Sequence, residues 1–306
     1  MTLTLAVCLK AAWRTDSAVR LAASGTAVRP DGAAPGLTPP DAGALAAALE
    51  LRASLRASGR EARVLALSVG PAAVEAVLRE ALAAGADEVL RVWPASAPQT
   101  FPDLDGSVGG TGTRARLAAQ ALRSRLAQGA LLAIAGEASG DEGHAAFGAA
   151  LAHALGLDFA HRVTHLEALS AGWRGRVKLE RGYTQEVPLG AAAVVTLAGA
   201  GPKLAEASWP AWLSSRTAPI PLLAAEPAAP DPLAVRSVTA LRPPLPRVKR
   251  FPLPDSTQPA EARIRALLGS QPQAGGTVIP ASEGTERHVG AIVALLAERG
   301  YLPGAP

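Results

Sequence analysis

Cysteine is almost absent from the sequence, and histidine is sparse. The 306 residues include one cysteine, Cys8, and five histidines. A single sulfur excludes an internal disulfide framework and a cysteine-based zinc cluster, because both need several cysteines. His161 and His165 are the only histidines four residues apart, but their segment has the pattern of a strand, so they would not share a helical face. We therefore expect no metal site, and a cytoplasmic location.

Charge is also scarce. Charged residues make up 18% of the chain, and 30 basic against 26 acidic residues give a formal net charge of +4. The lysines are only Lys10, Lys178, Lys203 and Lys249. The basic residues form no block, whereas nucleic-acid binding needs clustered positive charge. We therefore expect no nucleic-acid partner.

Long apolar runs are missing. The most apolar stretches, around residues 129–136 and 190–201, are well short of the roughly 20 residues needed to cross a bilayer. The first 13 residues lack a basic leading segment and carry Lys10 within their apolar run, which argues against a signal peptide. We expect no membrane insertion, and a buried first strand.

Small and apolar residues are abundant, and 49% of the chain is hydrophobic, enough to build a core. Up to about residue 136, short apolar runs alternate with long Ala/Leu-rich segments, which is typical of an α/β fold with an open, mostly parallel sheet flanked by helices. The strands expected here are Leu3–Leu9, Ala62–Ser68, Glu88–Val92 and Ala130–Ala135. The helices expected are Pro40–Ala57, Pro71–Ala84, Thr113–Gln128 and Glu142–Leu155.

The pattern changes after residue 155. Strands at 162–168, 175–179 and 191–197 would extend the sheet, with a hairpin turn near Ala171 and Gly172. From residue 219 to 259, 11 of 41 residues are proline, which cannot build a sheet interior or a long helix. We therefore expect an α/β domain at 1–218 and an extended proline-rich arm at 219–306. Short helices at 260–268 and 286–299 would pack on the domain or on a partner.

Three of the expected strand ends would meet at one edge of the sheet: Cys8–Lys10, Ser68–Pro71 and the loop Gly136–Gly148. Ligands of open α/β sheets bind outside the carboxyl ends of the strands. The loop is rich in glycine and precedes a helix, so its backbone N–H groups could hold a phosphate. The alternative is a flexible turn with an Asp or Ser cap.

The known nucleotide-binding, metal-binding and catalytic motifs do not identify a function for this chain. There is no Walker A pattern, no G-x-G-x-x-G after the first strand, no His-Glu-x-x-His and no readable catalytic triad. Gly110, Gly112 and Ala115 fit a looser G-x-G-x-x-A spacing but do not directly follow an expected strand, so we interpret them as a loop. Cys8 lies within an apolar strand, where a thiol is inert.

A family resemblance emerges from several motifs taken in order. They are Leu37-Thr38-Pro39-Pro40-Asp41, Ser68-Val69-Gly70-Pro71, Ala81 to Asp87, Ala193-Val194-Val195-Thr196, and Pro243-Pro244 with Arg247. In this order and spacing the chain, up to about residue 250, resembles the β subunit of electron-transfer flavoprotein. The corresponding family motifs are an Asn-Pro-x-(Asp/Cys) turn, a Ser-x-Gly-Pro turn, Ala-Leu-Ala-Met-Gly-Ala-Asp and Pro-Ala-Val-Val-Thr.

The resemblance implies an adenine-nucleotide-binding fold and a heterodimer with an α subunit. That subunit would hold the redox FAD, and this chain would bind AMP. By position, the resemblance assigns the AMP contacts to Cys8, Thr38, Pro39, Pro40, Asp41, Val69, Glu137, Ala138, Ser139, Gly140, Asp141, Glu142, Gly143, His144 and Gly148.

The nucleotide loop departs from the family pattern Gly-x-Gln-Ser-x-Asp-Gly-Asp-x-x-Gln-x-Gly. Ser139, Asp141 and Gly148 match it, whereas Ala138, Gly143 and Ala146 replace Gln, Asp and Gln, and Thr38 replaces the Asn of the earlier turn. The replaced side chains are those that the resemblance assigns to adenine and ribose contacts, whereas phosphate binding by backbone N–H groups does not depend on them. We hypothesise a weakened or altered nucleotide site.

The resemblance also implies a docking loop and a flavin-proximal acid. Trp209 and Pro210 occupy the apolar anchor position of the loop that docks partner dehydrogenases, and tryptophan is a favoured interface anchor. The alternative is a core tryptophan at a helix start. Glu180 lies where the family has an acidic residue near the flavin of the α subunit; the alternative is an exposed strand residue.

Taken together, the resemblance implies an electron-carrier subunit and not an enzyme in its own right. It would pair with its α partner to pass electrons from acyl-CoA or other flavin dehydrogenases to a quinone reductase, and so serve fatty acid oxidation. One rival is a stand-alone nucleotide-sensing domain of the same fold, because fold alone does not fix function. A nucleotide-hydrolysing or adenylating enzyme is disfavoured, since no Ser-Gly-Gly-x-Asp-Ser loop follows the first strand.

Overall fold

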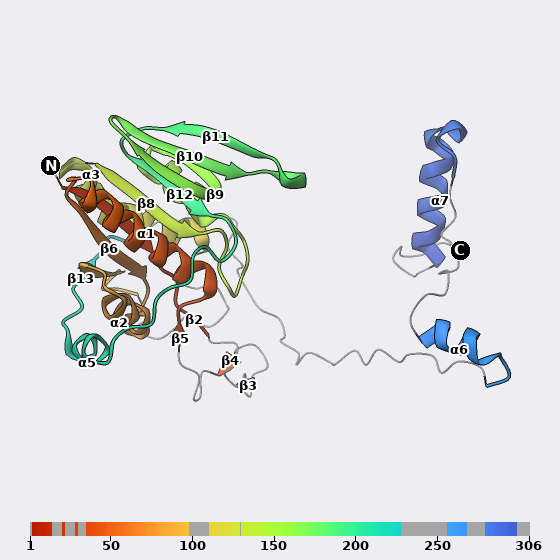
Figure 1. The fold of residues 1–306 in the computed structure, drawn as a ribbon, viewed down its shortest axis with the longest axis horizontal. Coiled ribbons are helices and arrows are strands. Elements are labelled where there is room, and N and C mark those ends of the chain that lie inside the picture. Colours follow the sequence, from red (N-terminus) through yellow and green to blue (C-terminus); the bar gives the residue numbers. More distant parts are fainter. Residues whose placement is uncertain are drawn as a thin grey trace. The chain divides into compact units, whose positions relative to one another are not determined.

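A computed structural model describes residues 2–13, 20–21, 28–29, 35–97, 110–128, 130–227, 256–267 and 279–298. The chain divides into two compact units, residues 1–243 and 244–306. Figure 1 shows the elements of both units along the chain.

The first unit is built on one nine-stranded sheet in the order β11-β10-β9-β12-β8-β1-β6-β7-β13. Neighbouring strands from β9 through to β13 in this order are all parallel. At the other end of the sheet, β10 is antiparallel to both β9 and β11. The strands are β1 (Leu3–Cys8), β6 (Ala62–Val69), β7 (Glu88–Trp93), β8 (Leu131–Gly136), β9 (Asp158–Leu169), β10 (Gly172–Lys178), β11 (Thr184–Leu189), β12 (Ala193–Leu197) and β13 (Leu222–Ala224). The α/β fold with a mostly parallel sheet is therefore confirmed.

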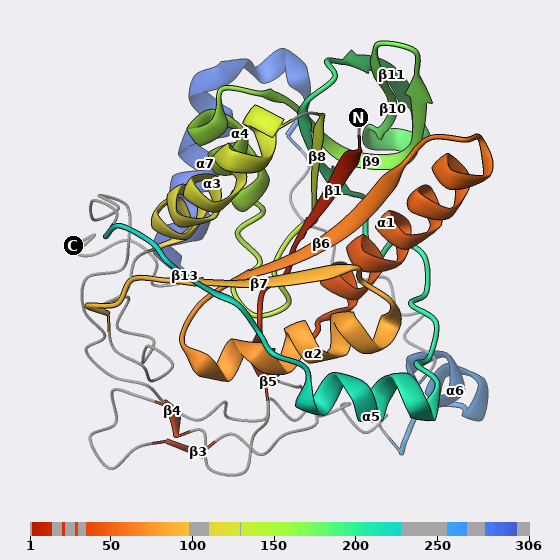
Figure 2. The same cartoon turned by 90° about the vertical axis from the view of Figure 1, so that its left-hand side faces the viewer.

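Helices cover both faces of this sheet (Figure 2). The helices of this unit are α1 (Pro39–Ala57), α2 (Glu75–Ala84), α3 (Thr111–Gln128), α4 (Phe147–Leu155) and α5 (Trp209–Thr217). Because successive side chains of a strand point to opposite faces, Leu5 and Val7 of β1 pack under α1 and α2, whereas Ala6 and Cys8 pack under α3 and α4. α5 packs against α2.

Four very short strands pair outside the main sheet. β2 (Ala12–Trp13) is antiparallel to β5 (Pro35–Gly36), and β3 (Arg20–Leu21) is antiparallel to β4 (Val28–Arg29). The β2–β5 pair lies just before α1 and so ties the end of β1 to the start of that helix.

The strands β1, β6, β7, β8 and β12 and the helices α1 and α3 were predicted to within two residues, but two helix starts were predicted wrongly. α2 begins at Glu75 after a 3-10 turn at Ala72–Val74, because Pro71 has extended backbone and caps that turn. α4 begins at Phe147 and not at Glu142, because Gly143 and Ala145 have left-handed backbones with φ of +67° and +53°. The predicted left-handed stop of α2 at Gly85 is confirmed, with φ of +106°.

The antiparallel extension is larger than predicted. β9 begins at Asp158, the hairpin turn before Gly172 is confirmed, and the whole of β11 was missed. β11 is an edge strand whose residues are mostly exposed, and it contains Pro188. An exposed edge strand does not need alternating apolar and polar residues, and it tolerates proline. Its sequence therefore lacks the pattern from which a strand is predicted.

The segment expected to be an extended arm begins with an ordered strand. β13 lies between Pro221 and Ala225 and pairs with the edge of β7, where proline can flank a strand without breaking a ladder. Residues 228–255, with the motif residues Pro243, Pro244 and Arg247, lie outside the described part of the chain.

The second unit contains α6 (Ala260–Leu267), a 3-10 turn (Ala281–Glu283) and α7 (Gly284–Glu298), close to the predicted helices. On α7 the apolar side chains Val289, Ile292, Val293 and Leu296 are all more than one third exposed. Among the described residues, no helix combines the length and the apolar character that a membrane crossing requires.

Candidate functional site

A pocket lies at the carboxyl ends of the adjacent strands β1, β6 and β8, beside the starts of α1, α3 and α4. Its empty volume is about 680 Å³, which includes open solvent at its mouth. Eight of the predicted site residues line it: Cys8, Asp41, Val69, Glu137, Ala138, Ser139, Glu142 and His144. The pocket thus brings together segments that are up to 136 positions apart in the sequence, at the edge where ligands of this fold class bind.

The other predicted nucleotide residues support the pocket or lie next to it. Gly136 and Gly140 pass very close to the start of α1: an added Cβ would lie 2.7 Å from Cβ of Pro40 and 2.6 Å from Cγ2 of Thr38, respectively. Thr38 and Pro40 thus pack against the loop, and none of Thr38, Pro39 and Pro40 lines the pocket. Gly148 contacts Thr196 and Phe159 instead of lining the pocket.

Asp41 is a buried carboxyl group in the floor of the pocket, with 5% of the residue exposed. Burial raises its pKa from 3.8 to about 7, while hydrogen bonds from the Thr38 hydroxyl and the Lys10 backbone N–H, and the Lys10 charge, act in the opposite direction. Asp41 therefore changes charge near neutral pH. Burial and the nearby Asp41 charge raise the pKa of the Cys8 thiol to about 12, so this cysteine is unreactive as predicted.

Lys10 was not singled out as a site residue, yet it organises the mouth of the pocket. Its Nζ lies 2.7 Å from Oδ1 of Asp141 and 3.1 Å from Oε2 of Glu142. Burial acts to raise the pKa of Asp141, but the hydrogen bond and charge of Lys10 outweigh it and hold this pKa below its ordinary value. The sequence did offer one signal for Lys10, because this residue comes directly after the first strand, at the edge where ligands bind.

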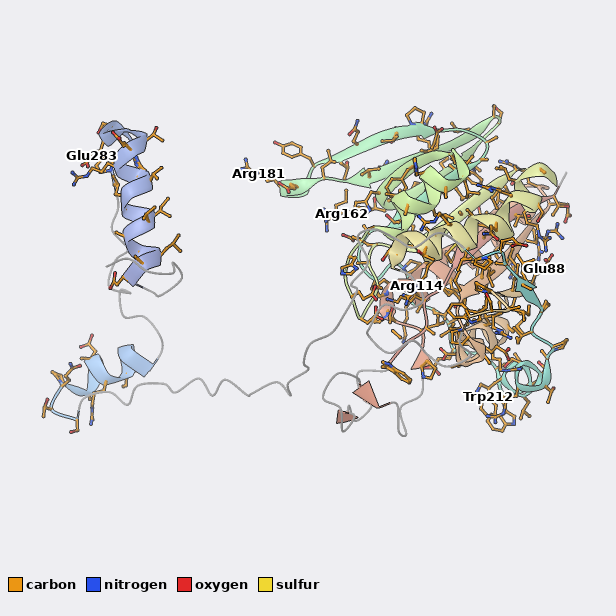
Figure 3. The ribbon with its side chains drawn as sticks, turned by 180° about the vertical axis from the view of Figure 1, so that it is seen from behind. Glu88, Arg114, Arg162, Arg181, Trp212 and Glu283 are labelled. Atoms are coloured by element: carbon orange, nitrogen blue, oxygen red, sulfur yellow. The ribbon has the colours of Figure 1, made fainter. Side chains whose placement is uncertain are left out.

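Arg114 was also missed. It lies in the first turn of α3 and lines the pocket, and its Nη1 is 3.9 Å from Oε1 of Glu142 (Figure 3). Nδ1 of His144 lies 3.6 Å from Oε2 of the same carboxylate. The loose Gly110-x-Gly112-x-x-Ala115 pattern marked this helix start, but the sequence does not place it beside the other strand ends.

One wall of the pocket is tied to the antiparallel extension. Oε1 of Glu137 lies 3.1 Å from Nε of Arg162, and the Gly199 N–H donates a 2.7 Å hydrogen bond to Oε2 of Glu137. Arg162 has a left-handed backbone with φ of +60°, and its N–H donates to Oγ1 of Thr196. The Glu137 carboxylate is therefore bound by Arg162 and Gly199 and does not pair with Lys10 or Arg114 at the pocket mouth.

The two histidines singled out in the sequence, His161 and His165, lie on β9. Nδ1 of His161 lies 2.8 Å from Oγ1 of Thr196, so this ring has a structural partner. In the described ranges, no group of three or more His, Cys, Asp or Glu side chains is arranged as a metal site.

The predicted anchor Trp209 is a surface residue, 67% exposed, so the alternative of a core tryptophan is wrong. It is the first residue of α5, followed by Pro210, and the Ala211 N–H donates to Oγ of Ser208 at the helix start. The Trp209 ring stacks on Trp212 with centroids 4.9 Å apart and an interplanar angle of 17°. Trp212, labelled in Figure 3, was missed, although the spacing of three residues indicated a shared helical face.

The guanidinium of Arg216 lies over the Trp212 ring, 4.9 Å from its centroid. Leu213 on the same helix is 47% exposed. Trp209, Trp212, Leu213 and Arg216 are called the α5 surface below. This surface presents aromatic, apolar and cationic groups together, a composition enriched in protein interfaces.

Glu180 lies in a 3-10 turn (Glu180–Gly182) at the tip of the β10–β11 hairpin and is exposed. It is thus a turn residue and not a strand residue. Figure 3 labels its neighbour Arg181 at the tip, which projects from the sheet. Glu180 does not line the pocket.

Comparison with known protein families gives a match over much of the first unit. The family model described as the electron transfer flavoprotein domain matches residues 29–228, which is 200 of the 306 residues. No curated protein matches the chain. The matched segment contains α1, β6, β8 and the loop after β8, and therefore most of the pocket. The chain belongs to the electron transfer flavoprotein domain family.

Proposed function

We propose that this chain is a β-like subunit of an electron transfer flavoprotein. It pairs with an α subunit that binds FAD, and the complex carries electrons from flavin dehydrogenases to an acceptor such as a quinone reductase. The chain makes and breaks no bonds itself, because the flavin supplies the redox chemistry and the protein supplies burial and electrostatics. The pocket carries this proposal: Cys8, Asp41, Val69 and the loop 137–144 meet there, and the family resemblance assigns these positions to AMP.

The lining of the pocket suits a nucleotide. Leu67, Val69, Ala135 and Phe147 offer apolar surface for an adenine ring. Lys10 and Arg114 at the mouth offer positive charge for a phosphate, which cationic side chains bind through charge-assisted hydrogen bonds. We assign the AMP to this pocket, with the FAD held by the partner subunit.

The α5 surface is the proposed docking site for the dehydrogenase. A stacked, exposed tryptophan pair loses a large apolar area from water when a partner covers it, and little side-chain entropy is lost because the two rings already hold each other. Arg79 anchors the helix, since its Nη1 donates hydrogen bonds of 2.7 and 2.9 Å to the carbonyl oxygens of Ser215 and Ala218. The surface is therefore presented on a fixed helix.

The β10–β11 hairpin is the proposed approach to the flavin of the partner. Its tip exposes Glu180 with the apolar neighbours Leu179 and Tyr183, which are 40% and 70% exposed. An exposed tip of this composition supports contact with a second subunit, in which Glu180 would lie near the flavin.

The test is to co-express the chain with an electron transfer flavoprotein α subunit and purify the complex through a tag on this chain. Bound cofactors are released by denaturation and separated by chromatography. We expect about one FAD per complex together with AMP. A chain that purifies alone and colourless, with AMP bound, would contradict the electron-carrier role and support the nucleotide-sensing alternative.

A further inference from the structure

Three basic side chains from different parts of the chain surround one carboxylate at the pocket mouth. Oε2 of Glu142 lies 3.1 Å from Nζ of Lys10 and 3.6 Å from Nδ1 of His144, and Oε1 lies 3.9 Å from Nη1 of Arg114. Lys10 follows β1, Arg114 belongs to α3 and His144 belongs to the loop before α4. All four residues line the pocket, so the carboxylate borders the space that a ligand would enter.

Arg114 stands in an unfavourable place unless an anion is opposite it. It lies in the first turn of α3, an 18-residue helix with no acidic residue in that turn. The start of a helix carries a partial positive charge, which repels cations and attracts anions. Figure 3 shows Arg114 on this helix. The carboxylate of Glu142 supplies the missing negative charge from a different segment.

The contact between Glu142 and Arg114 is loose. At 3.9 Å it is beyond hydrogen-bond distance, and the two side chains are 34% and 24% exposed. Ion pairs of this exposure contribute little to stability. Lys10 has a second and shorter partner in Asp141, at 2.7 Å, so it would keep a counterion if Glu142 moved away.

The turn that carries Glu142 has its own hydrogen bonds. Gly143 follows Glu142 with φ of +67°, and its N–H donates to the backbone oxygen of Ser139 at 3.1 Å and to Oγ of Ser139 at 3.2 Å. The Glu142 side chain is 34% exposed. The movement that the carboxylate needs to leave the pocket is therefore a rotation of this side chain and not of the backbone.

We propose that Glu142 is a built-in substitute for a ligand phosphate. Its carboxylate occupies an anion subsite formed by Lys10, Arg114, His144 and the start of α3, and the phosphate of a nucleoside monophosphate displaces it from there. This inference rests on the proposed function, because it takes the pocket to be the nucleotide site. It predicts that the natural chain binds the nucleotide less tightly than a chain without this carboxylate, since the ligand must displace Glu142.

The test measures AMP, adenosine and inorganic phosphate binding to the full chain by isothermal titration calorimetry. Glu142→Gln removes the competing charge, so we expect it to bind AMP about tenfold more tightly than the natural chain and adenosine with unchanged affinity. Adding Arg114→Gln to that variant should cancel the gain. The control Glu88→Gln removes a carboxylate of similar exposure, 31%, that pairs with Arg63 and Arg125 and does not line the pocket.

Equal AMP affinity of the Glu142→Gln variant and the natural chain would overturn the inference, and so would an equal gain for adenosine, because phosphate would then not be the displacing group. A gain of the same size in the Glu88→Gln control would also overturn it, because net charge alone would explain the effect. If no variant binds any of the three probes the inference fails, while the FAD content of the co-expressed complex still decides the electron-carrier role.

Discussion

The hydroxyl of Thr38 donates a 2.9 Å hydrogen bond to Oδ2 of Asp41, one turn further into α1. A threonine before a helix ordinarily accepts a hydrogen bond from a backbone N–H of the first turn. Here the first two helical residues are Pro39 and Pro40, which have no N–H, and the hydroxyl instead donates to the buried carboxyl group. The two prolines thereby place Asp41 in the pocket floor with a fixed partner.

Asp41 makes stability depend on pH. Because its pKa is about 7 in the folded chain and 3.8 when exposed, the folded state holds a proton that the unfolded state has released between these values. The contribution of Asp41 to the free energy of unfolding therefore falls as pH rises from about 4 to 7 and is constant above pH 7. Asp41→Asn removes this loss, so its stability relative to the natural chain should increase across the window, by up to about 4 kcal/mol. Urea unfolding at pH 4.5, 6 and 8 measures the difference, and a constant difference would contradict it.

Trp209→Ala should slow electron transfer without harming the fold. The side chain is 67% exposed, so its loss removes little core packing, but it removes the centre of the proposed docking surface. We expect the rate of flavin reduction by the dehydrogenase to fall about tenfold or more, a typical cost for an interface anchor. Trp209→Phe keeps an aromatic ring against Trp212 and should retain much of the rate. An unaltered rate in the alanine variant would remove the docking role.

Gly43→Ala should strongly destabilise the first unit. An added Cβ would overlap the carbonyl group of Ala200, so α1 and the loop after β12 would have to separate. Overpacking of this kind costs roughly 1–3 kcal/mol. The matched control is Gly290→Ala on α7, where nothing lies within 4 Å and alanine favours the helix. Chemical denaturation of both variants is the measurement, and equal stability of Gly43→Ala and the natural chain would refute the close approach.

Asp87 acts as a clamp between α1 and the sheet. Its carboxylate accepts hydrogen bonds from Nη1 of Arg52 at 2.7 Å, Nη2 of Arg56 at 3.2 Å and the Val64 N–H at 2.8 Å. Burial acts to raise its pKa, but these bonds and the Arg52 charge lower it below 3.8. The stabilisation is thus present above pH 4 and is lost as pH falls through the folded pKa.

We expect Asp87→Ala to cost about 1–3 kcal/mol at pH 7, because two arginines and one backbone N–H lose their acceptor. The cost should shrink as pH falls through the lowered folded pKa of Asp87, because the natural carboxylate then loses its charge. Thermal unfolding of both chains along a pH series from 7 into acid checks this. A cost that does not change with pH would mean that packing and not charge is responsible.

The sequence was informative where one physical signal dominates. β1, β6 and β8 are buried on both faces, so they appear as continuous apolar runs. β11 and β13 lie at sheet edges, where exposed polar residues and flanking prolines leave no such signal. The start of α4 was misplaced because acidic residues normally favour a first helical turn, whereas Asp141 and Glu142 pair with Lys10, more than 130 positions away.

The same distinction applies to the site. Cys8, Val69 and the loop after β8 could be placed together, because the carboxyl ends of parallel strands share one edge. The roles of Lys10 and Arg114 could not be predicted in this way, since they depend on the position of α3 relative to that edge. Asp87 shows the opposite case: it belongs to a motif of the family resemblance, yet its contacts clamp the fold and do not line the pocket.

β13 covers the backbone of β7 that would otherwise form the end of the sheet, and β11 ends the other side with Glu186 and Pro188. Unpaired strand edges recruit other chains by backbone hydrogen bonding, and charges, prolines and short covering strands prevent it. A fragment ending at residue 218 would lack β13 and leave β7 uncovered. The few residues that follow α5 thus protect the sheet against self-association, independently of any partner.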